Sequence, residues 1–489
     1  MFITLYISVF SKYFDGKIYM GALIKNKNIG SDVMDRQDII VPRIKISTLK
    51  VGSSMDVYSM RRDSSLWEES FVKRRMDSRL LKEFIQKDKE WRQIVVQLDE
   101  FRSKRNKISH QISREQGNQS LVEQARELNK NMEDLESKIK DVVSDRDKLL
   151  LSIPNLVDPL QPIDNATTIA VLGTPHVDEA KVENFRKENP DVNFKKVQLT
   201  MNQYDIIKKY KLVNEERGAE LSGSRFYYKT NELSILDMSL SLYAMKILYN
   251  SGFQAITPPY LVKRYVEERA TTLDAFEETL YKVEGEDLFL IPTAEHPIAA
   301  FNAGVVFNKE QLPLRYAGFS TSFRKEAGSH GKDTKGIYRN HHFNKVEQYV
   351  ITDPEKMEDE LNTLINNQVK FLLSLNIPVR IIKLPTWDMD KKAIFHVDIE
   401  GWFPGQNRFG ELGSHAIVGT WQATRLNIKY LPSEKEDAQY VCTIYGTMLP
   451  VERTLACMLE NNLGEDGTIT VPKPLADISG INEIKKSAD

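Results

Sequence analysis

The chain contains very little cysteine: Cys442 and Cys457 are the only two in 489 residues. Two thiols cannot build a disulfide framework or a cysteine-rich zinc site, and such low usage is typical of proteins from a reducing compartment. Long apolar runs are missing as well, since no stretch reaches the roughly 20 apolar residues that a membrane-spanning helix needs. We therefore expect a cytoplasmic protein without a membrane partner.

The chain also has almost no net charge, only −2 at pH 7. This balance argues against nonspecific nucleic-acid binding by the whole surface, although it leaves room for a local basic arm. Hydrophobic residues make up 41% and charged residues 28% of the sequence, as in globular proteins. Because 489 residues exceed one ordinary core, we expect two or three domains.

The clearest periodic pattern lies between residues 80 and 150. Apolar residues recur there at alternating three- and four-residue steps, in two stretches separated by EQGNQS at 115–120. Two such stripes with a short connection predict an antiparallel helical hairpin with a coiled-coil seam. A helix of about 35 residues is roughly 50 Å long, which is more than a domain core needs, so the hairpin should project into solvent.

One face of the first predicted helix is basic near its end, with acidic residues interspersed. The cations are Arg102, Lys104, Lys107 and Arg114, and the acids are Glu100 and Glu115. Two interpretations stay open from the residues alone: a solvated coiled-coil surface, or an arm that contacts nucleic-acid phosphates.

The rest of the chain has a different organisation. Pro154 and Pro159 follow the hairpin and favour a domain boundary there. A helical pattern from 232 ends at Gly252, and short β-rich runs follow with connections too short for crossover helices. The predicted fold class is therefore α+β, with the hairpin followed by an antiparallel sheet flanked by helices. We expect a poorly defined extension at 1–54, a hairpin domain at 55–158 and a second domain at 159–489.

The stretch FRKEAGSHGKDTKGIYRNHHFNKVEQY at 323–349 gathers cations, carboxylates and histidines. We predict two strands joined by a glycine-containing loop that suits close approach to a polyanion. An arginine beside a phenylalanine can hold a phosphate and stack on a flat base, and a nearby carboxylate can hold an ammonium. Strand alternation would place Ser322, Arg324 and Glu326 on one face, and Arg339, His341, Phe343, Lys345 and Glu347 on another. The combination suits a nucleotide plus an amino acid.

A metal site is the alternative for this stretch, because zinc would need two or three converging histidines. His341 and His342 are consecutive, so on a strand they would point to opposite faces. We therefore do not expect zinc here.

At this point the sequence resembles a known family. The 323–349 stretch is similar to motif 2 of class II aminoacyl-tRNA synthetases, in the form found in seryl-tRNA synthetases of the archaeal and eukaryotic cytosolic type. YKVEGEDLFLIPTAEHPIAAF at 281–301 resembles the amino-acid loop of that family, ITPPYLV resembles motif 1, and GTMLPVERTLACMLENN at 446–462 resembles motif 3. The predicted hairpin resembles the arm with which the family reaches the long variable arm of its tRNA. The resemblance covers about residues 55–475.

The resemblance implies a serine–tRNA ligase that uses ATP and Mg²⁺ to form seryl-adenylate and then charges tRNA(Ser). It makes 55–158 the tRNA-binding coiled-coil domain and 159–489 the catalytic domain, and it implies a homodimer paired through motif 1. The implied ATP-binding residues are Arg324, Lys325, Glu326, Asn340, Phe343, Glu411, Leu412, Gly413, Ser414 and Arg453. The implied serine-binding residues are Thr293, Ala294, Glu295, Glu347 and Thr447. Glu411 and Ser414 would also bind Mg²⁺, and Arg324 and Arg453 would hold the α- and γ-phosphates as the catalytic residues.

Three departures from the family pattern concern the amino-acid pocket. HAIVGTWQATR at 415–425 lacks the Asn, Cys and Asp that most members carry, and Thr424 replaces an Arg. Tyr445 stands where most members have Asn, at the substrate end of the pocket, and Pro450 and Glu452 stand where many relatives have small residues. Two hypotheses follow: an active serine–tRNA ligase, or a paralogue that has lost serine charging and binds tRNA, serves as a partner or activates another acyl group.

Overall fold

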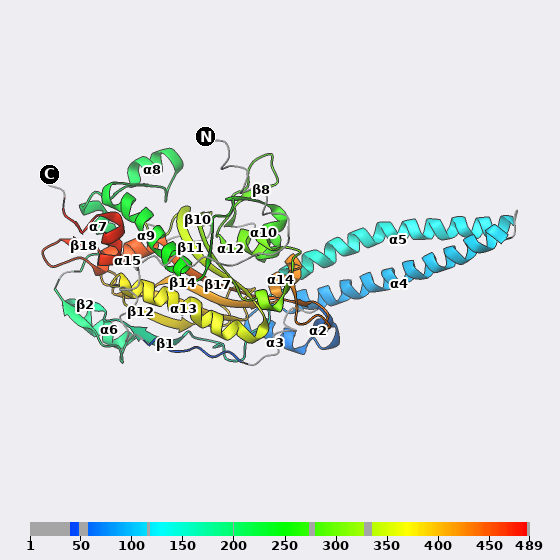
Figure 1. Cartoon of the computed structure of the whole chain (residues 1–489), viewed down its shortest axis with the longest axis horizontal. Helices are drawn as coiled ribbons and strands as arrows, with labels where there is room; N and C mark the ends of the chain where they lie inside the picture. The colour runs from blue at the N-terminus through cyan, green and yellow to red at the C-terminus, as the bar shows by residue number, and fades with distance from the viewer. Residues whose placement is uncertain are drawn as a thin grey trace, which may run out of the picture. The chain divides into compact units, whose positions relative to one another are not determined.

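The predicted helical hairpin is confirmed. The computed structural model describes residues 40–47, 57–114, 118–198, 200–272, 279–326 and 335–486. Helices α4 (Arg79–Arg114) and α5 (Gln119–Ser152) run side by side and lead away from the sheet (Figure 1). Ile94 and Leu98 of α4 are buried against Met132 and Val142 of α5, which are stripe positions of the heptad pattern.

A buried carboxylate anchors the base of the hairpin. Asp88 of α4 is 1% exposed, and its two oxygens accept hydrogen bonds from Arg61 Nε at 2.7 Å and Arg146 Nε at 2.9 Å. Arg61 belongs to the short helix α2 (Val57–Arg62), and Arg146 belongs to α5. The pairs compensate the burial of the charge and connect three helices at one point. Helix α3 (Ser65–Lys73) buries Trp67 and Phe71 beside this base.

The second part of the chain is built on an eight-stranded sheet. Its strand order is β1-β12-β13-β14-β17-β11-β10-β6, and every neighbouring pair is antiparallel except β10 with β6. In this order the strands are β1 (Thr167–Leu172), β12 (Val379–Lys383), β13 (Phe395–Phe403), β14 (Arg408–Gly419), β17 (Cys442–Pro450), β11 (His342–Thr352), β10 (Leu314–Phe323) and β6 (Gln254–Ile256). The predicted antiparallel sheet is thus confirmed.

Strands β14 and β17 lie in the middle of the sheet, and the sequence pattern did not indicate them. All nine residues of β17 are buried, and β14 is buried over most of its length. A strand that is buried on both faces shows no polar–apolar alternation.

Helices cover the sheet, as predicted (Figure 1). The long ones are α9 (Asn231–Asn250), α13 (Met357–Ser374) and α15 (Val451–Asn461). Helix α9 ends two residues before Gly252, which has a φ of +85° and so stops the helix where the sequence predicts it. The shorter elements are β2 (His176–Asp178), α6 (Val182–Glu188), β3 (Lys195–Val197), α7 (Gln203–Lys209), β4 (Val213–Asn214), α8 (Glu215–Ser222), β5 (Tyr228–Lys229), β7 (Leu261–Lys263), α10 (Arg264–Ala270), β8 (Leu288–Leu290), α12 (Glu295–Phe301), β9 (Val306–Asn308), α14 (Trp421–Leu426), β15 (Lys429–Leu431), β16 (Gln439–Tyr440), β18 (Ile469–Thr470), α16 (Lys473–Ser479) and β19 (Glu483–Ile484).

Part of the predicted N-terminal extension packs on the body. The backbone of Ile44 exchanges hydrogen bonds of 2.8 and 2.9 Å with the side chain of Asn362 on α13, and the side chain of Ile44 is buried. Ser47 donates to Asp158 at 3.0 Å. Residues 1–39 of the extension lie outside the described residues. Among the helices that the structure describes, none has the length and apolar character needed to cross a bilayer.

The predicted strand faces around 323–349 are wrong at the inner ends of both strands. Strand β10 ends at Phe323 and β11 begins at His342, so Arg324, Glu326, Arg339 and His341 lie outside the ladder. Phe323 and His342 are the last residues paired between β10 and β11. Beyond them, Arg324 N–H donates to His341 O at 2.9 Å, and Lys325 N–H then donates to Thr279 O instead of to the partner strand. Glu326 has a φ of +48°, which no strand residue adopts. Most of the glycine-containing loop, 327–334, lies outside the described residues.

The argument from strand alternation also fails for the two histidines. His341 precedes β11, and the rings of His341 and His342 both stack against Phe226, with centroids 5.0 and 5.5 Å from its ring. Side chains alternate between faces only within a strand, and β11 begins at His342, so His341 lies outside the strand. Among the described residues, no three His, Cys, Asp or Glu side chains are grouped so that they could hold a metal ion by themselves.

Candidate active site

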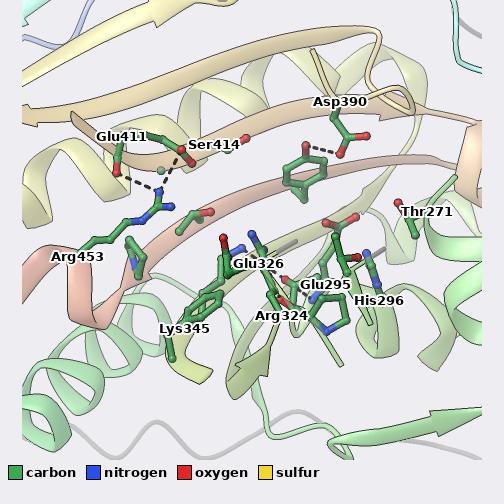
Figure 2. A pocket seen from close by; sticks show the side chains of 18 of the residues that line it. Thr271, Glu295, His296, Arg324, Glu326, Lys345, Asp390, Glu411, Ser414 and Arg453 are labelled. Carbon is green, nitrogen blue, oxygen red and sulfur yellow. Dashed lines mark hydrogen bonds and ion pairs between the residues drawn. The ribbon is translucent and has the colours of Figure 1, made fainter. Parts of the chain in front are cut away.

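A cavity of about 490 Å³ lies over the strands β11, β13, β14 and β17 and gathers most of the predicted site residues (Figure 2). Its volume is in the usual range for a small-molecule site. The predicted residues that line it are Thr293, Glu295, Arg324, Glu326, Asn340, Phe343, Glu411, Leu412, Gly413, Ser414, Thr447 and Arg453. They come from segments 293–295, 324–343, 411–414 and 447–453, so only the fold brings them together.

Three predicted residues do not line the cavity. Ala294 is fully buried in the core below the start of α12. Lys325 turns with the chain, and its N–H donates to Thr279 O at 2.9 Å. Glu347 is fully buried on β11, where it pairs with Lys345 and accepts a hydrogen bond from Thr293 Oγ1 at 3.4 Å. Glu347 therefore lies directly behind two lining residues.

Two guanidinium groups line the cavity. Arg453 projects from the first turn of α15, and its Nη1 lies 3.1 Å from Glu411 Oε2 on β14. Arg324 follows β10, and its guanidinium carbon lies 5.2 Å from the centroid of the Phe343 ring. Burial and the nearby Arg453 lower the pKa of Arg324, so the folded protein stabilises this cation poorly without an anion beside it. A phosphate group would supply that anion.

Hydrogen bonds hold Asn340 and Glu326, two polar residues that line the cavity along with Phe343. Asn340 donates from Nδ2 to Ile337 O at 2.6 Å and to Tyr227 Oη at 3.1 Å, while its Oδ1 is buried without a hydrogen-bond partner among the described residues. Glu326 accepts from Arg339 Nη1 at 2.7 Å. A flat ring bound beside Phe343 would find fixed polar groups at its edge.

A bulge in β14 brings the two predicted metal ligands to the cavity. Residues three apart on a regular strand would point to opposite faces. The register with β13 shifts between Ile399 and Glu400, and this irregularity allows Glu411 and Ser414 both to line the cavity. Arg453 lowers the pKa of Glu411, which keeps this carboxylate ionised.

The donor set at this end suits Mg²⁺. Glu411 and Ser414 offer oxygens only, and Ser414 Oγ lies 2.5 Å from His396 Nε2. Asp398, on the neighbouring strand, has a buried Oδ1 that makes no hydrogen bond among the described residues and lies 3.6 Å from His396 Nε2. Burial and, after it, the nearby Glu411 carboxylate raise the pKa of Asp398. Hard divalent cations bind oxygens in such surroundings together with phosphates.

The opposite end of the cavity carries carboxylates. Figure 2 shows Glu295, His296, Thr271 and Asp390 on this side, away from Glu411 and Arg453. Gln422 fixes Glu295, because its Nε2 donates to Glu295 Oε1 at 2.8 Å while its Oε1 accepts from Thr443 Oγ1 at 2.9 Å. A positioned carboxylate in a buried wall is suited to an ammonium group.

Sequence reasoning missed several residues at this end. The buried Lys392 pairs in the wall with Asp390, whose side chain is 26% exposed, and His296 Nδ1 lies 2.5 Å from the buried carboxylate of Glu267. All four line the cavity. The segment around Asp390 has no periodicity, so only the charged triplet DKK at 390–392, directly before an apolar run, could have drawn attention to it.

Three of the departures from the family pattern, Tyr445, Pro450 and Glu452, line the cavity, and Tyr445 contacts Asp390 at the amino-acid end. The Tyr445 hydroxyl donates to Asp390 Oδ2 at 3.0 Å. None of residues 415–424 lines the cavity. That segment completes β14 and forms α14 behind the wall, where Gln422 is its link to Glu295.

Comparisons with known proteins agree with this fold. Residues 279–462 match the family model described as the tRNA synthetase class II core domain (G, H, P, S and T). An antiparallel sheet with its cavity between motif 2 and motif 3 residues defines the same class, the class II aminoacyl-tRNA synthetases. Residues 55–157 match the model of the seryl-tRNA synthetase N-terminal domain. The serine–tRNA ligase of Pyrococcus horikoshii is 36% identical over 446 residues, which cover 88% of this chain and 97% of that protein. The chain belongs to the seryl-tRNA synthetase family.

Two solved structures are similar over nearly the whole chain. The crystal structure of seryl-tRNA synthetase from Pyrococcus horikoshii complexed with ATP matches with a TM-score of 0.83 and 35% identity, covering 88% of this chain and 100% of that one. The cytoplasmic serine–tRNA ligase from Naegleria fowleri in complex with AMP matches with a TM-score of 0.74 and 30% identity, covering 89% and 99%.

Proposed function

We propose that the protein is a serine–tRNA ligase, which activates L-serine with ATP and transfers the seryl group to tRNA(Ser). The observation that carries the proposal is a single cavity that is lined by Arg324 and Arg453 and has Glu295 on the side away from Arg453. The two guanidinium groups suit the ATP phosphates, and the carboxylate suits the serine ammonium. The relatives reported above are described as serine–tRNA ligases or seryl-tRNA synthetases.

The first step needs no protein nucleophile. A serine carboxylate oxygen attacks the α-phosphorus of ATP, the bond to the β-phosphate oxygen breaks, and pyrophosphate leaves with the electron pair. Arg324 holds the α-phosphate and Arg453 the γ-phosphate, so the chain contributes positioning and charge compensation. Phe343 stacks on the adenine, and Glu326 and Asn340 place its edge. Glu411 and Ser414 would hold Mg²⁺, which would supply further positive charge for the phosphates.

The second step transfers the seryl group to tRNA. A hydroxyl of the 3′-terminal ribose attacks the carbonyl carbon of seryl-adenylate, and AMP leaves. Helices α4 and α5 hold the tRNA at a distance from the cavity, through the exposed cations Lys104, Lys107 and Arg114. Arg102 contributes less, because it already pairs with Asp99 and Glu136.

The activity has a direct test in ATP–pyrophosphate exchange across a panel of amino acids, followed by tRNA charging. We expect serine-dependent exchange and charging of tRNA(Ser). No exchange with serine would contradict the proposal, exchange without charging would indicate a ligase for another acceptor, and tRNA binding without exchange would indicate a binding module. Nothing in the described residues or in the relatives reported above favours these alternatives.

We also propose a homodimer in the cytoplasm, the location named for the Naegleria fowleri relative. The support for a dimer is an apolar face on α9, where Ile235, Met238, Leu242 and Tyr249 are 42%, 60%, 52% and 66% exposed. The spacing puts these residues on one side of the helix. The neighbouring strand β6 is an edge of the sheet with an open hydrogen-bonding side.

Introducing a charge into this face should separate the subunits. Met238→Glu is expected to shift the mass in sedimentation from twice 56.3 kDa to 56.3 kDa, because a buried unpaired carboxylate opposes association. Val72→Glu, at an exposed apolar residue of α3, is the matched control and should stay dimeric. A parent protein that sediments as a monomer would contradict the proposed dimer.

A further inference from the structure

The wall at the amino-acid end contains a charged group that the roles proposed above do not use. Lys392 is 3% exposed, pairs with Asp390, and has its Nζ 3.6 Å from Glu295 Oε1. The same Nζ lies 4.7 Å from the centroid of the Tyr445 ring, and Tyr445 Oη donates to Asp390. Asp390, Lys392, Tyr445 and Glu295 therefore form one connected network, and all four line the cavity.

The ammonium of Lys392 has more N–H groups than it has carboxylate partners among the described residues. It carries three N–H groups, and its partners among the described residues are Asp390 and Glu295. Burial opposes its charge, but Asp390 and Glu295 outweigh burial and raise the pKa of Lys392, so the group is a cation at neutral pH. A buried cation with an unused donor favours an oxygen acceptor.

The charges around the network indicate which kind of oxygen group on the substrate Lys392 would bind. Lys345 pairs with Glu347, whereas Lys392 faces the two carboxylates of Asp390 and Glu295, so these three residues together carry one negative charge in excess. The α-ammonium of an amino acid balances that charge. A side-chain carboxylate on the substrate would restore the excess, while a hydroxyl would accept from Lys392 without adding charge.

Tyr445 limits the room for the side chain. Its ring is 6% exposed, its hydroxyl is tied to Asp390, and its neighbours across the sheet are Tyr349 on β11 and Ala416 on β14. Packed from both strands and held at its tip, the ring forms a rigid part of the wall rather than a movable one.

We propose that Lys392 and Tyr445 determine the amino-acid specificity of this chain: the Lys392 ammonium donates to the side-chain hydroxyl, and the Tyr445 ring excludes longer side chains. Asp390 is a positioning residue that holds both. The inference rests on the proposed function, because it assigns the side-chain end of the same substrate. It makes Lys392 the group that distinguishes serine from alanine, and Tyr445 the group that distinguishes serine from threonine.

The test measures kcat/KM in ATP–pyrophosphate exchange with serine, threonine and alanine. Tyr445→Ala should raise the threonine-to-serine ratio at least tenfold, and Tyr445→Phe, which keeps the ring, should leave it within threefold. Asp390→Asn combined with Lys392→Gln removes the two paired charges together and should lower the serine-to-alanine ratio at least tenfold. Tyr430→Phe is the matched control, because Tyr430 is a buried tyrosine whose hydroxyl bonds to Gln439 and does not line the cavity.

The ratios separate a specificity role from a structural one, since a damaged fold lowers all three kcat/KM values together. Should Tyr445→Ala melt below the assay temperature, Tyr445→Leu gives the same comparison with a better filled core. Ratios within twofold of the parent in Tyr445→Leu and in the double variant would overturn the inference and leave the proposed function intact. A parent protein that does not activate serine would overturn the proposed function first, and with it the inference.

Discussion

Arg324→Ala is expected to reduce serine-dependent ATP–pyrophosphate exchange by on the order of 10³-fold, the size of effect seen when a preorganised charged donor is removed from a developing negative charge. The guanidinium lines the cavity beside Phe343, and its Nε donates to Pro292 O at 3.3 Å, which aims the side chain. Arg324→Lys should restore only part of the rate, because an ammonium cannot make the two parallel bonds of a guanidinium.

The same substitution should leave the fold intact. Burial and Arg453 lower the pKa of Arg324, so removal of this poorly stabilised cation should not lower the melting temperature. Arg186→Ala, at an exposed arginine of α6 outside the cavity, is the control and should exchange at the parent rate. Parent-like exchange by Arg324→Ala would show that Arg324 does not hold a phosphate.

Removal of the outer hairpin should separate the two steps of the reaction. We consider a deletion of residues 99–135, bridged by a short glycine–serine linker. It is expected to leave the rate of serine activation within about threefold of the parent rate. It should lower tRNA charging by at least ~10²-fold, because the loss of several phosphate contacts weakens tRNA binding by about that factor. The cut keeps Asp88 with Arg61 and Arg146, so the base of the hairpin stays closed. Deletion of 80–150 would remove that anchor.

Charge substitutions show whether the arm contacts phosphates. Lys104, Lys107 and Arg114 changed together to alanine should raise KM for tRNA and flatten its dependence on salt, because fewer counterions are released on binding. The matched control changes three acidic residues of α5, Glu123, Glu127 and Glu133, to alanine, which removes as many charges of the other sign. Charging by the 99–135 deletion at the parent rate would show that the arm does not present the tRNA.

Much of the fold could be predicted from local pattern. The heptad stripes predicted α4 and α5, because apolar residues three and four positions apart lie on one face of a helix, and this pattern depends only on neighbouring sequence. The end of α9 followed from Gly252 in the same way. The failures lie where long-range packing decides: β14 and β17 are buried on both faces and show no period, and β10 ends at Phe323 because Lys325 bonds to Thr279 from another segment. The domain boundaries and the roles of the site residues stay predictions.

The sequence by itself determined the kind of chemistry. The residues of 323–349 and of 446–462 occur in an order that resembles one family. Of the fifteen site residues predicted for this chain from that resemblance, twelve line one cavity in the fold. What only the tertiary structure decided is the shape of the amino-acid end. Tyr445 and Asp390 are 55 residues apart in the chain, yet they share a hydrogen bond, while residues 415–424 lie behind the wall. Side-chain contact across strands depends on register and burial, and neither can be read from residues so far apart in sequence.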